Sequence, residues 1–334
     1  MIGLNRSIRI ALPSKGLLAE GSRKLLAEVG FKVYNPNPRQ YQAQIPSLPG
    51  IEVIFQRPGD IVVSVRDGSV DFGITGRDIY LEKRGANGRI LELHSQLGFG
   101  KCTLNVIVPE SWETITDIEH LQQKQKLLKR PLKVATKFPN LTKAFISDRH
   151  DFEFELIQAE GTLEIAPTVG YADLIVDLVS TGTTLKDNRL KPLSGGEIIC
   201  SEACLIANKA RLKFSSETLT MATQLLEFIG AHLRANDRLA IFANVRGRSP
   251  ESIAQLVFQQ EAIGGLQGPT VSQVITRQGQ KWFAVHLIVH KNQLHQAIRE
   301  IREIGGSGVV VSPVSYIFEE EPIEVSDMIA ALEY

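Results

Sequence analysis

Cysteine is scarce in this chain, and long apolar runs are missing from it. Three cysteines, Cys102, Cys200 and Cys204, occur among 334 residues, which is typical of a reducing compartment and excludes a disulfide scaffold. Cys200 and Cys204 lie four residues apart without a nearby histidine pair, so we expect two small buried residues rather than a zinc site. No run of about eighteen apolar residues occurs, and no secretory leader opens the chain. These absences predict a cytoplasmic protein without a membrane segment.

An excess of charge of either sign is also missing. The 37 basic and 37 acidic side chains cancel, so no overall field favours nucleic acid or an anionic membrane as partner. Hydrophobic residues make up 43% and charged residues 22%, which is ordinary for a globular protein. Any anion must therefore be held by local groups, in a chain long enough for two or three domains.

Strand and helix patterns alternate through the first two thirds of the chain. The opening "IRIALP" predicts a strand, and the leucines that follow at helical spacing predict a helix ending at Gly30. The same alternation recurs over residues 51–76. Residues 90–100 and 102–109 have the pattern of an antiparallel pair, after which a second block of strands and helices begins. We expect mainly parallel sheets covered by helices.

A different pattern begins at Arg238, after a long amphipathic helix. Strand, helix, two strands joined by a turn, helix and strand follow one another, with Ser249 as N-cap of the first helix and Pro250 at its first position. The order βαββαβ predicts a ferredoxin-like module over residues 238–318. The acidic tail 319–334 has no assignment from its sequence.

The stretch "DLVSTGTTL", residues 177–185, concentrates hydroxyl side chains around one glycine. One interpretation is a strand end followed by a hydroxyl-rich turn and a helix cap. The other is a phosphate-binding loop, because Gly182 lets backbone N–H groups converge while the hydroxyls add donors. The loop residues are Ser180, Thr181, Gly182, Thr183 and Thr184. No Walker A sequence is present, so a P-loop NTPase site is excluded.

Two carboxylates precede this loop. Asp173 and Asp177 are four residues apart, which places them on one face of a strand or a helix. A carboxylate at the mouth of a phosphate loop suits ribose hydroxyls, or an outer-sphere hold on Mg²⁺ that bridges phosphates. For Asp173, capping or solvating the strand end is an equally good interpretation. Asp177 adjoins the apolar pair Leu178 and Val179 and is the stronger candidate.

The segment 160–190 resembles the signature of ATP phosphoribosyltransferase, the first enzyme of histidine biosynthesis. The family shares Glu-x-Ala-Pro, Ala-Asp-x-Ile-x-Asp and a Ser/Thr-Gly-x-Thr-Leu loop. The matching positions here are Glu164, Ala166, Pro167, Gly170, Ala172, Asp173, Ile175, Asp177, Leu178, Val179, Ser180, Thr181, Gly182, Thr184 and Leu185. Further windows, among them "ALPSKGLL", "RPGDIVVSVRDGSVDFGITGRD" and "VATKFPNLTKAF", extend the resemblance over residues 8–317.

The resemblance implies a catalytic core of two α/β lobes like those of type II periplasmic binding proteins, with the site in the cleft. We assign residues 1–104 and 190–236 to lobe I, 105–189 to lobe II and 238–318 to a ferredoxin-like regulatory domain. The implied reaction joins C1 of phosphoribosyl pyrophosphate to N1 of ATP and releases pyrophosphate, with Mg²⁺ as cofactor. Both substrates are polyanions, so positioning and charge stabilisation should outweigh acid-base catalysis.

Roles for particular residues follow from the same resemblance. Loop 180–184 would bind the 5-phosphate, and Asp177, with Asp173, the ribose hydroxyls. Lys15, Arg57 and Lys101 are candidates for pyrophosphate or triphosphate oxygens, or else ordinary solvated charges. Thr103 stands where the family commonly has Arg, so that either Lys101 substitutes for it or the nucleotide binds differently.

The long form of the family has a third domain that binds histidine. The resemblance therefore implies feedback inhibition by histidine within a hexamer, which could also exchange with dimers. The matching positions are Asn244, Leu266, Thr270 and Gly308. Family members often have Asp at the position of Asn244, and a neutral amide would hold the ligand's amine less strongly.

Two other functions fit parts of the pattern. A non-catalytic ligand-binding protein could share the two-lobed fold, but an intracellular effector domain of that kind would carry a helix-turn-helix, and none is evident. Another class of phosphoribosyltransferase would have two adjacent acidic residues before its Thr-rich loop. Here three apolar residues separate Asp173 from Asp177.

Overall fold

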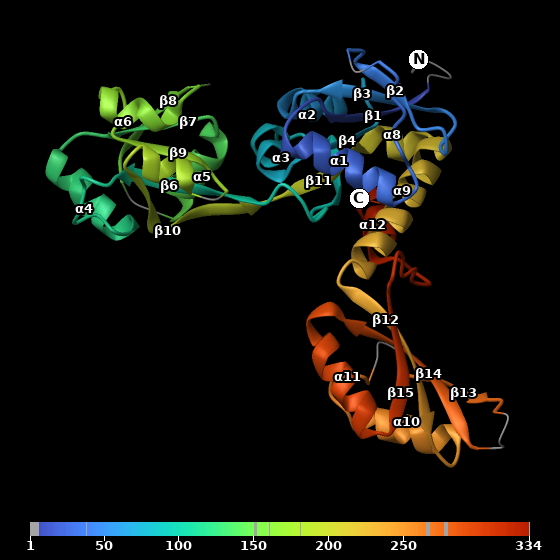
Figure 1. Cartoon of the computed structure of the whole chain (residues 1–334). Coiled ribbons are helices and arrows are strands. Elements are labelled where there is room, and N and C mark those ends of the chain that lie inside the picture. Colours follow the sequence, from blue (N-terminus) through green and yellow to red (C-terminus); the bar gives the residue numbers. More distant parts are fainter. Residues whose placement is uncertain are drawn as a thin grey trace. The chain divides into compact units, whose positions relative to one another are not determined.

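The computed structural model describes residues 7–37, 39–149, 152–159, 161–180, 182–264, 268–276 and 280–333. The chain forms two compact units, Met1–Gln224 with Glu324–Tyr334 and Leu225–Ile323. Among the described residues, no helix is long and apolar enough to cross a membrane. Figure 1 labels many of the helices and strands of both units.

The first sheet has the strand order β2-β3-β1-β4-β11-β5. Its strands are β1 (Ile8–Pro13), β2 (Gln42–Gln44), β3 (Ile51–Gln56), β4 (Phe72–Gly76), β5 (Ile90–His94) and β11 (Ala203–Asn208). β1 pairs in parallel with β3 and β4, and β11 lies antiparallel between β4 and β5. β4 and β11 are buried along their whole length, as expected for strands covered on both faces.

Helices accompany this first sheet, which together with them forms lobe I. They are α1 (Leu17–Glu28), α2 (Pro58–Arg66), α3 (Arg77–Lys83), α8 (Lys209–Phe214) and the first part of α9 (Ser216–Ala235). α1 buries Leu25 and Leu26 at the spacing that the sequence predicts. The long helix expected before residue 238 is α9, which continues from one unit into the other.

The second sheet has the order β10-β6-β9-β7-β8 and forms lobe II. Its strands are β6 (Cys102–Pro109), β7 (Leu132–Thr136), β8 (Phe154–Gln158), β9 (Leu174–Val179) and β10 (Leu190–Ser201). The helices along it are α4 (Ile118–Leu128), α5 (Pro139–Arg149), the 3-10 turn η1 (Leu163–Ile165), α6 (Ala166–Val169) and α7 (Thr183–Asp187). β9 is the middle strand, which places its carboxyl end at the centre of the lobe.

Two chain crossings join the lobes, and both differ from the sequence expectation. β5 lies in the first sheet and β6 in the second, so residues 90–100 and 102–109 do not pair with each other. β10 pairs with β6, so residues 190–201 belong with the second sheet, whereas the sequence placed them in lobe I. β10 is an edge strand, which leaves Cys200 exposed, while Cys204 in the central strand β11 is buried. The expectation of two buried cysteines was therefore wrong for Cys200.

A buried carboxylate of lobe I caps a helix of lobe II. Glu82 of α3 is 7% exposed and accepts hydrogen bonds of 3.0 Å from the backbone N–H groups of Asn140 and Leu141, in the first turn of α5. An acidic group at this end satisfies donors that the helix itself leaves unpaired. This contact ties α5 to lobe I.

The C-terminal unit holds a four-stranded antiparallel sheet of order β13-β14-β12-β15. Its elements are β12 (Arg238–Arg246), α10 (Pro250–Phe258), β13 (Thr270–Val274), β14 (Trp282–His290), the 3-10 turn η2 (Lys291–Gln293), α11 (Leu294–Glu303) and β15 (Gly306–Pro313). Ser249 caps α10 in a capping box with Ser252, and Pro250 is the first residue of the helix. This order and strand arrangement confirm the ferredoxin-like fold of this unit.

Candidate active site

The hydroxyl-rich loop follows the middle strand of the second sheet. Gly182 has φ +75°, and a Cβ built there would meet nothing within 4 Å, so the backbone conformation rather than space favours glycine. Leu185 of α7 is buried and anchors the loop. Ser180, Thr183 and Thr184 are exposed, whereas Thr181 lies outside the described residues. The loop thus presents hydroxyl groups at the carboxyl end of β9.

Asp177 lies on the strand that leads into this loop. It is half-buried and accepts a 2.8 Å hydrogen bond from the backbone N–H of Leu178. Burial raises the pKa of the Asp177 carboxyl above its ordinary value. Asp177 pairs with Asn105 of β6 and Val179 with Thr103, so these four side chains share one face of the sheet.

Two charged groups near Asp177 were not among the sequence candidates. Lys137, which follows the parallel strand β7, lowers the pKa of Asp177, whereas Glu164 raises it; both effects are smaller than that of burial. Parallel strands end at the same edge of a sheet, so Lys137 and the loop emerge on the same side. Lys137 is exposed and Glu164 half-buried. Both fall inside windows that resemble the family, which was the available signal for them.

Asp173 has a different environment. It lies just before β9, and Arg130 donates two hydrogen bonds of 2.7 and 2.8 Å to its carboxylate oxygens. The backbone N–H of Lys133 adds a third, of 2.8 Å. Arg130 holds the pKa of Asp173 below its ordinary value. Four residues of strand separate the two carboxylates by roughly 13 Å, so the structure brings Asp173 together with Arg130 rather than with the loop.

A cavity of about 560 Å³ adjoins the loop where the chain crosses between the lobes. Its lining residues come from the start of α3, the two crossings, β6, the end of β9 and the end of β10: Arg77, Ser95, Gln96, Lys101, Cys102, Thr103, Val179, Ser180, Cys200, Ser201 and Glu202. The cavity brings the predicted residues Lys101 and Ser180 together. Burial raises the pKa of the Cys102 thiol to about 11, so this cysteine stays protonated and is no nucleophile at neutral pH.

Arg77 is a second cation on the cavity wall. It opens α3, and its Nε and Nη2 donate to the two carboxylate oxygens of Glu92 at 2.7 and 3.4 Å. The hydrogen bond that Arg77 donates to Glu92 raises the pKa of Arg77 above its ordinary value. Lys101 reaches Glu202 at 3.9 Å and is 77% exposed, so its ammonium group faces solvent. The cavity therefore combines two cations with a hydroxyl donor of the loop.

Lys15 and Arg57 lie at neighbouring strand ends of the first sheet. Lys15 follows β1 and Arg57 follows β3, and the backbone of the two segments is joined by a 2.9 Å hydrogen bond from Ser14 to Gln56. Both cations are exposed and neither lines the cavity. A Cβ at Gly100 would lie 2.7 Å from the side chain of Leu18, so the start of α1 packs beside the segment that carries Lys101.

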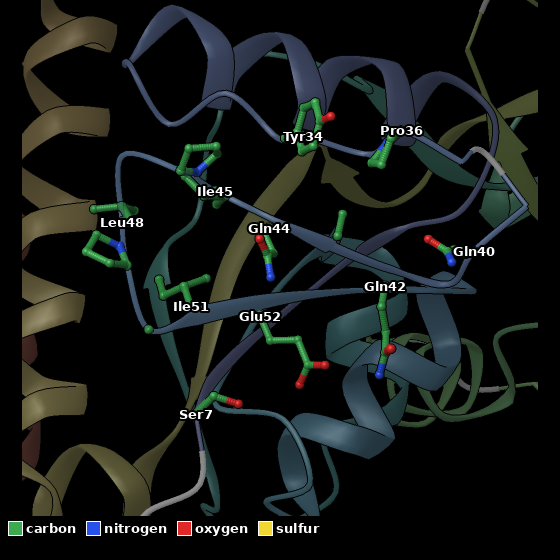
Figure 2. A pocket seen from close by; sticks show the side chains of 14 residues that line it. Ser7, Tyr34, Pro36, Gln40, Gln42, Gln44, Ile45, Leu48, Ile51 and Glu52 are labelled. Carbon is green, nitrogen blue, oxygen red and sulfur yellow. The ribbon is translucent and has the colours of Figure 1, made fainter.

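A larger cavity, of about 710 Å³, lies along the β2 edge of the first sheet (Figure 2). Of the described residues that line it, Glu52 alone is charged, and Arg9 donates to it at 2.9 Å. Gln42 and Gln44 supply amides, and Ile45 and Ile51 supply apolar surface (Figure 2). A lining with no cation of its own is a poor host for a polyanion, so the chemistry favours the smaller cavity.

Comparison with known proteins bears on what this site does. The family model described as ATP phosphoribosyltransferase matches residues 57–229, and the model of its C-terminal domain matches residues 235–316. The chain belongs to the ATP phosphoribosyltransferase family. The presence of the C-terminal domain marks it as the long form, and the chain is an enzyme of histidine biosynthesis.

Relatives in plants and archaea resemble the chain over nearly its full length. ATP phosphoribosyltransferase 2, chloroplastic, of Arabidopsis thaliana is 42% identical over 332 residues, which cover 97% of this chain and 80% of the relative. ATP phosphoribosyltransferase of Methanosarcina barkeri is 34% identical and covers 93% of this chain and 99% of its own. A chain of the ATP phosphoribosyl transferase (HisG:HisZ) complex of Thermotoga maritima has a TM-score of 0.52 at 24% identity, covering 67% of this chain and 98% of that chain. This last likeness concerns the fold alone.

The third domain of this phosphoribosyltransferase brings two of the predicted histidine-site residues together. Asn244 of β12 and Gly308 of β15 lie on paired strands, and a Cβ at Gly308, where φ is +62°, would lie 3.6 Å from Nδ2 of Asn244. Thr270 begins β13, with β14 between it and β12. Leu266 lies outside the described residues.

Proposed function

We propose that the enzyme transfers the phosphoribosyl group of phosphoribosyl pyrophosphate to N1 of the adenine of ATP and releases pyrophosphate. The observation that supports this most is the cavity in which Ser180 of the signature loop meets Lys101 and Arg77. Asp177 shares a sheet face with Thr103 and Val179, which line the same cavity. An anion site and a ribose-binding carboxylate thus adjoin each other.

In the proposed reaction a nitrogen lone pair of N1 forms the bond to C1 while the bond from C1 to the pyrophosphate oxygen breaks. The electron pair leaves with pyrophosphate, and the configuration at C1 inverts. N1 has a lone pair and no proton, so no general base is needed for the attack. The protein's part is to hold both substrates in line and to stabilise the charge that develops on the leaving group.

Each part of the site has one task in this proposal. Residues 180–184 bind the 5-phosphate with backbone and hydroxyl donors. Asp177 accepts hydrogen bonds from the ribose hydroxyls, and Arg77 and Lys101 face the leaving pyrophosphate. Lys15 and Arg57, at the ends of β1 and β3, are the candidates for triphosphate oxygens. Asp173, paired with Arg130, fixes the start of β9 and so the position of Asp177.

Mg²⁺ is the cofactor that this proposal includes. Among the residues that the structure describes, no group of three His, Cys, Asp or Glu side chains could hold a metal ion. The ion would instead arrive with the polyphosphate, and Asp177 would act on its water shell. The ion would supply positive charge to the phosphate oxygens.

The decisive experiment is to identify the product. We expect a species that carries the mass of ATP plus a phosphoribosyl group, with nitrogen-15 NMR placing the new bond at N1 of adenine. A protein that binds both substrates but forms no such species would instead be a ligand-binding member of the fold. Attachment at another atom would contradict the proposed orientation of ATP.

We also propose that L-histidine binds the C-terminal domain at Asn244, Thr270, Gly308 and Leu266 and inhibits the enzyme, which assembles as a hexamer able to exchange with dimers. The adjacency of Asn244 and Gly308 supports a site on the β12–β15 pair. Sedimentation with and without histidine tests the assembly.

The cytoplasmic location predicted from composition stays a prediction, and both Arabidopsis relatives are named as chloroplastic.

Replacing Asn244 by Asp should strengthen histidine binding about tenfold, because a charge-assisted hydrogen bond to the amine replaces a neutral one. Calorimetric titration with L-histidine measures the change. Asn292→Asp adds the same charge at an exposed position of η2 and should leave the Kd unchanged. Equal Kd values for the wild type and Asn244→Asp would remove Asn244 from the histidine site.

A further inference from the structure

The acidic tail without a sequence assignment ends in a helix of the catalytic unit. α12 (Ile323–Glu333) lies beyond both ranges that the family models match. Its residues from Glu324 onward belong to the same compact unit as the two lobes. Met328 is 2% and Leu332 9% exposed, so one side of the helix is docked.

α12 lies across a cavity from β5, the edge strand of the first sheet. A cavity of about 530 Å³ between them is lined by β5 and the residue after it, by α12 and by Arg77: Leu91, Glu92, Leu93, His94, Ser95, Glu324, Asp327, Met328, Ala331 and Arg77. β5 pairs with β11 on one side and is the last strand of the sheet on the other. α12 is thus the helix that faces β5 across this cavity.

Two connections lead from this helix to the candidate active site. Glu92 of β5 accepts both hydrogen bonds from Arg77, and Arg77 lines the cavity at α12 as well as the cavity beside the signature loop. His94, the last residue of β5, lies 3.9 Å from Glu324 through Nε2. Its Nδ1 accepts a hydrogen bond of 3.2 Å from the backbone N–H of Gln96, which lines the substrate cavity.

We propose that α12 is a positioning element for the active site: it braces β5 so that Glu92 holds Arg77, and His94 holds the Gln96 turn, in place for the leaving pyrophosphate. This proposal rests on the proposed function of the substrate cavity. The chain enters α12 directly from the C-terminal unit, whose last residue is Ile323.

The test compares variants of the full chain by pyrophosphate binding in calorimetry and by transferase kinetics. Met328→Ala removes the side chain that α12 buries beside β5 and should weaken pyrophosphate binding about fivefold, the size typical of coupling through packed elements. We expect KM for phosphoribosyl pyrophosphate to rise in parallel while kcat changes less. Met328→Leu preserves volume and should restore wild-type values.

A double substitution separates positioning from general stability. If α12 acts in part through Arg77, Met328→Ala should cause a smaller loss in an Arg77→Met background than in the wild type. Glu324→Gln, compared with Glu333→Gln on the exposed end of the same helix, tests the contact to His94 without emptying the core. Only Glu324→Gln should weaken pyrophosphate binding.

Unchanged pyrophosphate affinity in both Met328→Ala and Glu324→Gln would overturn the proposal, as would the same fivefold loss when Arg77 is already absent. If the wild type binds pyrophosphate but forms no phosphoribosyl-ATP, the proposed function fails while the role of α12 is still decided by the binding data.

Discussion

Asp177→Asn should lower kcat/KM for phosphoribosyl pyrophosphate about a hundredfold, because two ribose hydroxyls would each lose a charge-assisted hydrogen bond. The substitution should not destabilise the fold. Burial raises the pKa of this carboxyl, so its ionised form is disfavoured in the folded state, and removing the charge should leave the Tm at pH 7 unchanged or higher. Steady-state kinetics and a thermal melt measure both effects.

The same substitution at Asp173 provides a matched control four residues earlier. Arg130 holds the pKa of Asp173 low, so its stabilising contribution is present above the ordinary carboxyl pKa and is lost as pH falls through the lowered one. Asp173→Asn should cost about 1 kcal/mol of stability, since Arg130 is half exposed, with little change in KM. A larger kinetic loss at Asp173 than at Asp177 would exchange the roles of the two carboxylates.

The pH profile adds an independent check on Asp177. A ribose-binding carboxylate must be ionised, and its pKa is raised, so activity should fall with decreasing pH at values above the ordinary aspartate pKa. Asp177→Asn should remove this acid limb. An acid limb that persists in the variant would assign the titration to another group.

Combining Gly182→Ala with Thr184→Val should raise KM for phosphoribosyl pyrophosphate about fiftyfold. Alanine at φ +75° costs about 1 kcal/mol or more, and the lost hydroxyl removes a donor worth about 1 to 1.5 kcal/mol. Because the strained loop leaves the conformation in which its N–H groups converge on the phosphate, the two changes together lower the binding free energy by roughly 2 to 3 kcal/mol. Initial rates over a range of phosphoribosyl pyrophosphate concentrations measure the change.

Gly170→Ala is the matched control for the loop. Gly170 ends α6 in the same lobe with φ +84°, and a Cβ there would also meet nothing within 4 Å. The backbone strain is therefore alike, but the position lies outside the loop. A rise in KM in Gly170→Ala equal to that in the loop variant would point to destabilised lobe packing instead of lost phosphate contacts.

Local patterns predicted much of the fold because each element carries its own periodicity. The apolar run before Asp177 became β9, the amphipathic spacing after residue 215 became α9, and Ser249 with Pro250 opened α10. Strand partners were harder to predict. Nothing in the pattern of residues 190–201 says that β10 pairs with β6 and not with the first sheet, since alternation reports a buried face and not the neighbouring strand.

The candidate site could be predicted only where its residues are neighbours in the sequence. The loop could be found because its residues are contiguous, and the family resemblance gave it a ligand. Arg77 lies in a window that resembles the family, but it was missed because its role depends on Glu92, fifteen positions later, and on the two chain crossings that surround it. Equal spacing on one strand face suggested similar roles for Asp173 and Asp177, but the pairing of Asp173 with Arg130 depends on the tertiary fold.

The most direct test of the central claim follows the reaction in wild type and Asp177→Asn side by side. Both proteins receive ATP, phosphoribosyl pyrophosphate and Mg²⁺, with a pyrophosphatase to draw the reaction forward, and phosphoribosyl-ATP is quantified with time. We expect product with the wild type and a rate about a hundredfold lower with the variant. No product from the wild type, or equal rates from the two proteins, would contradict it.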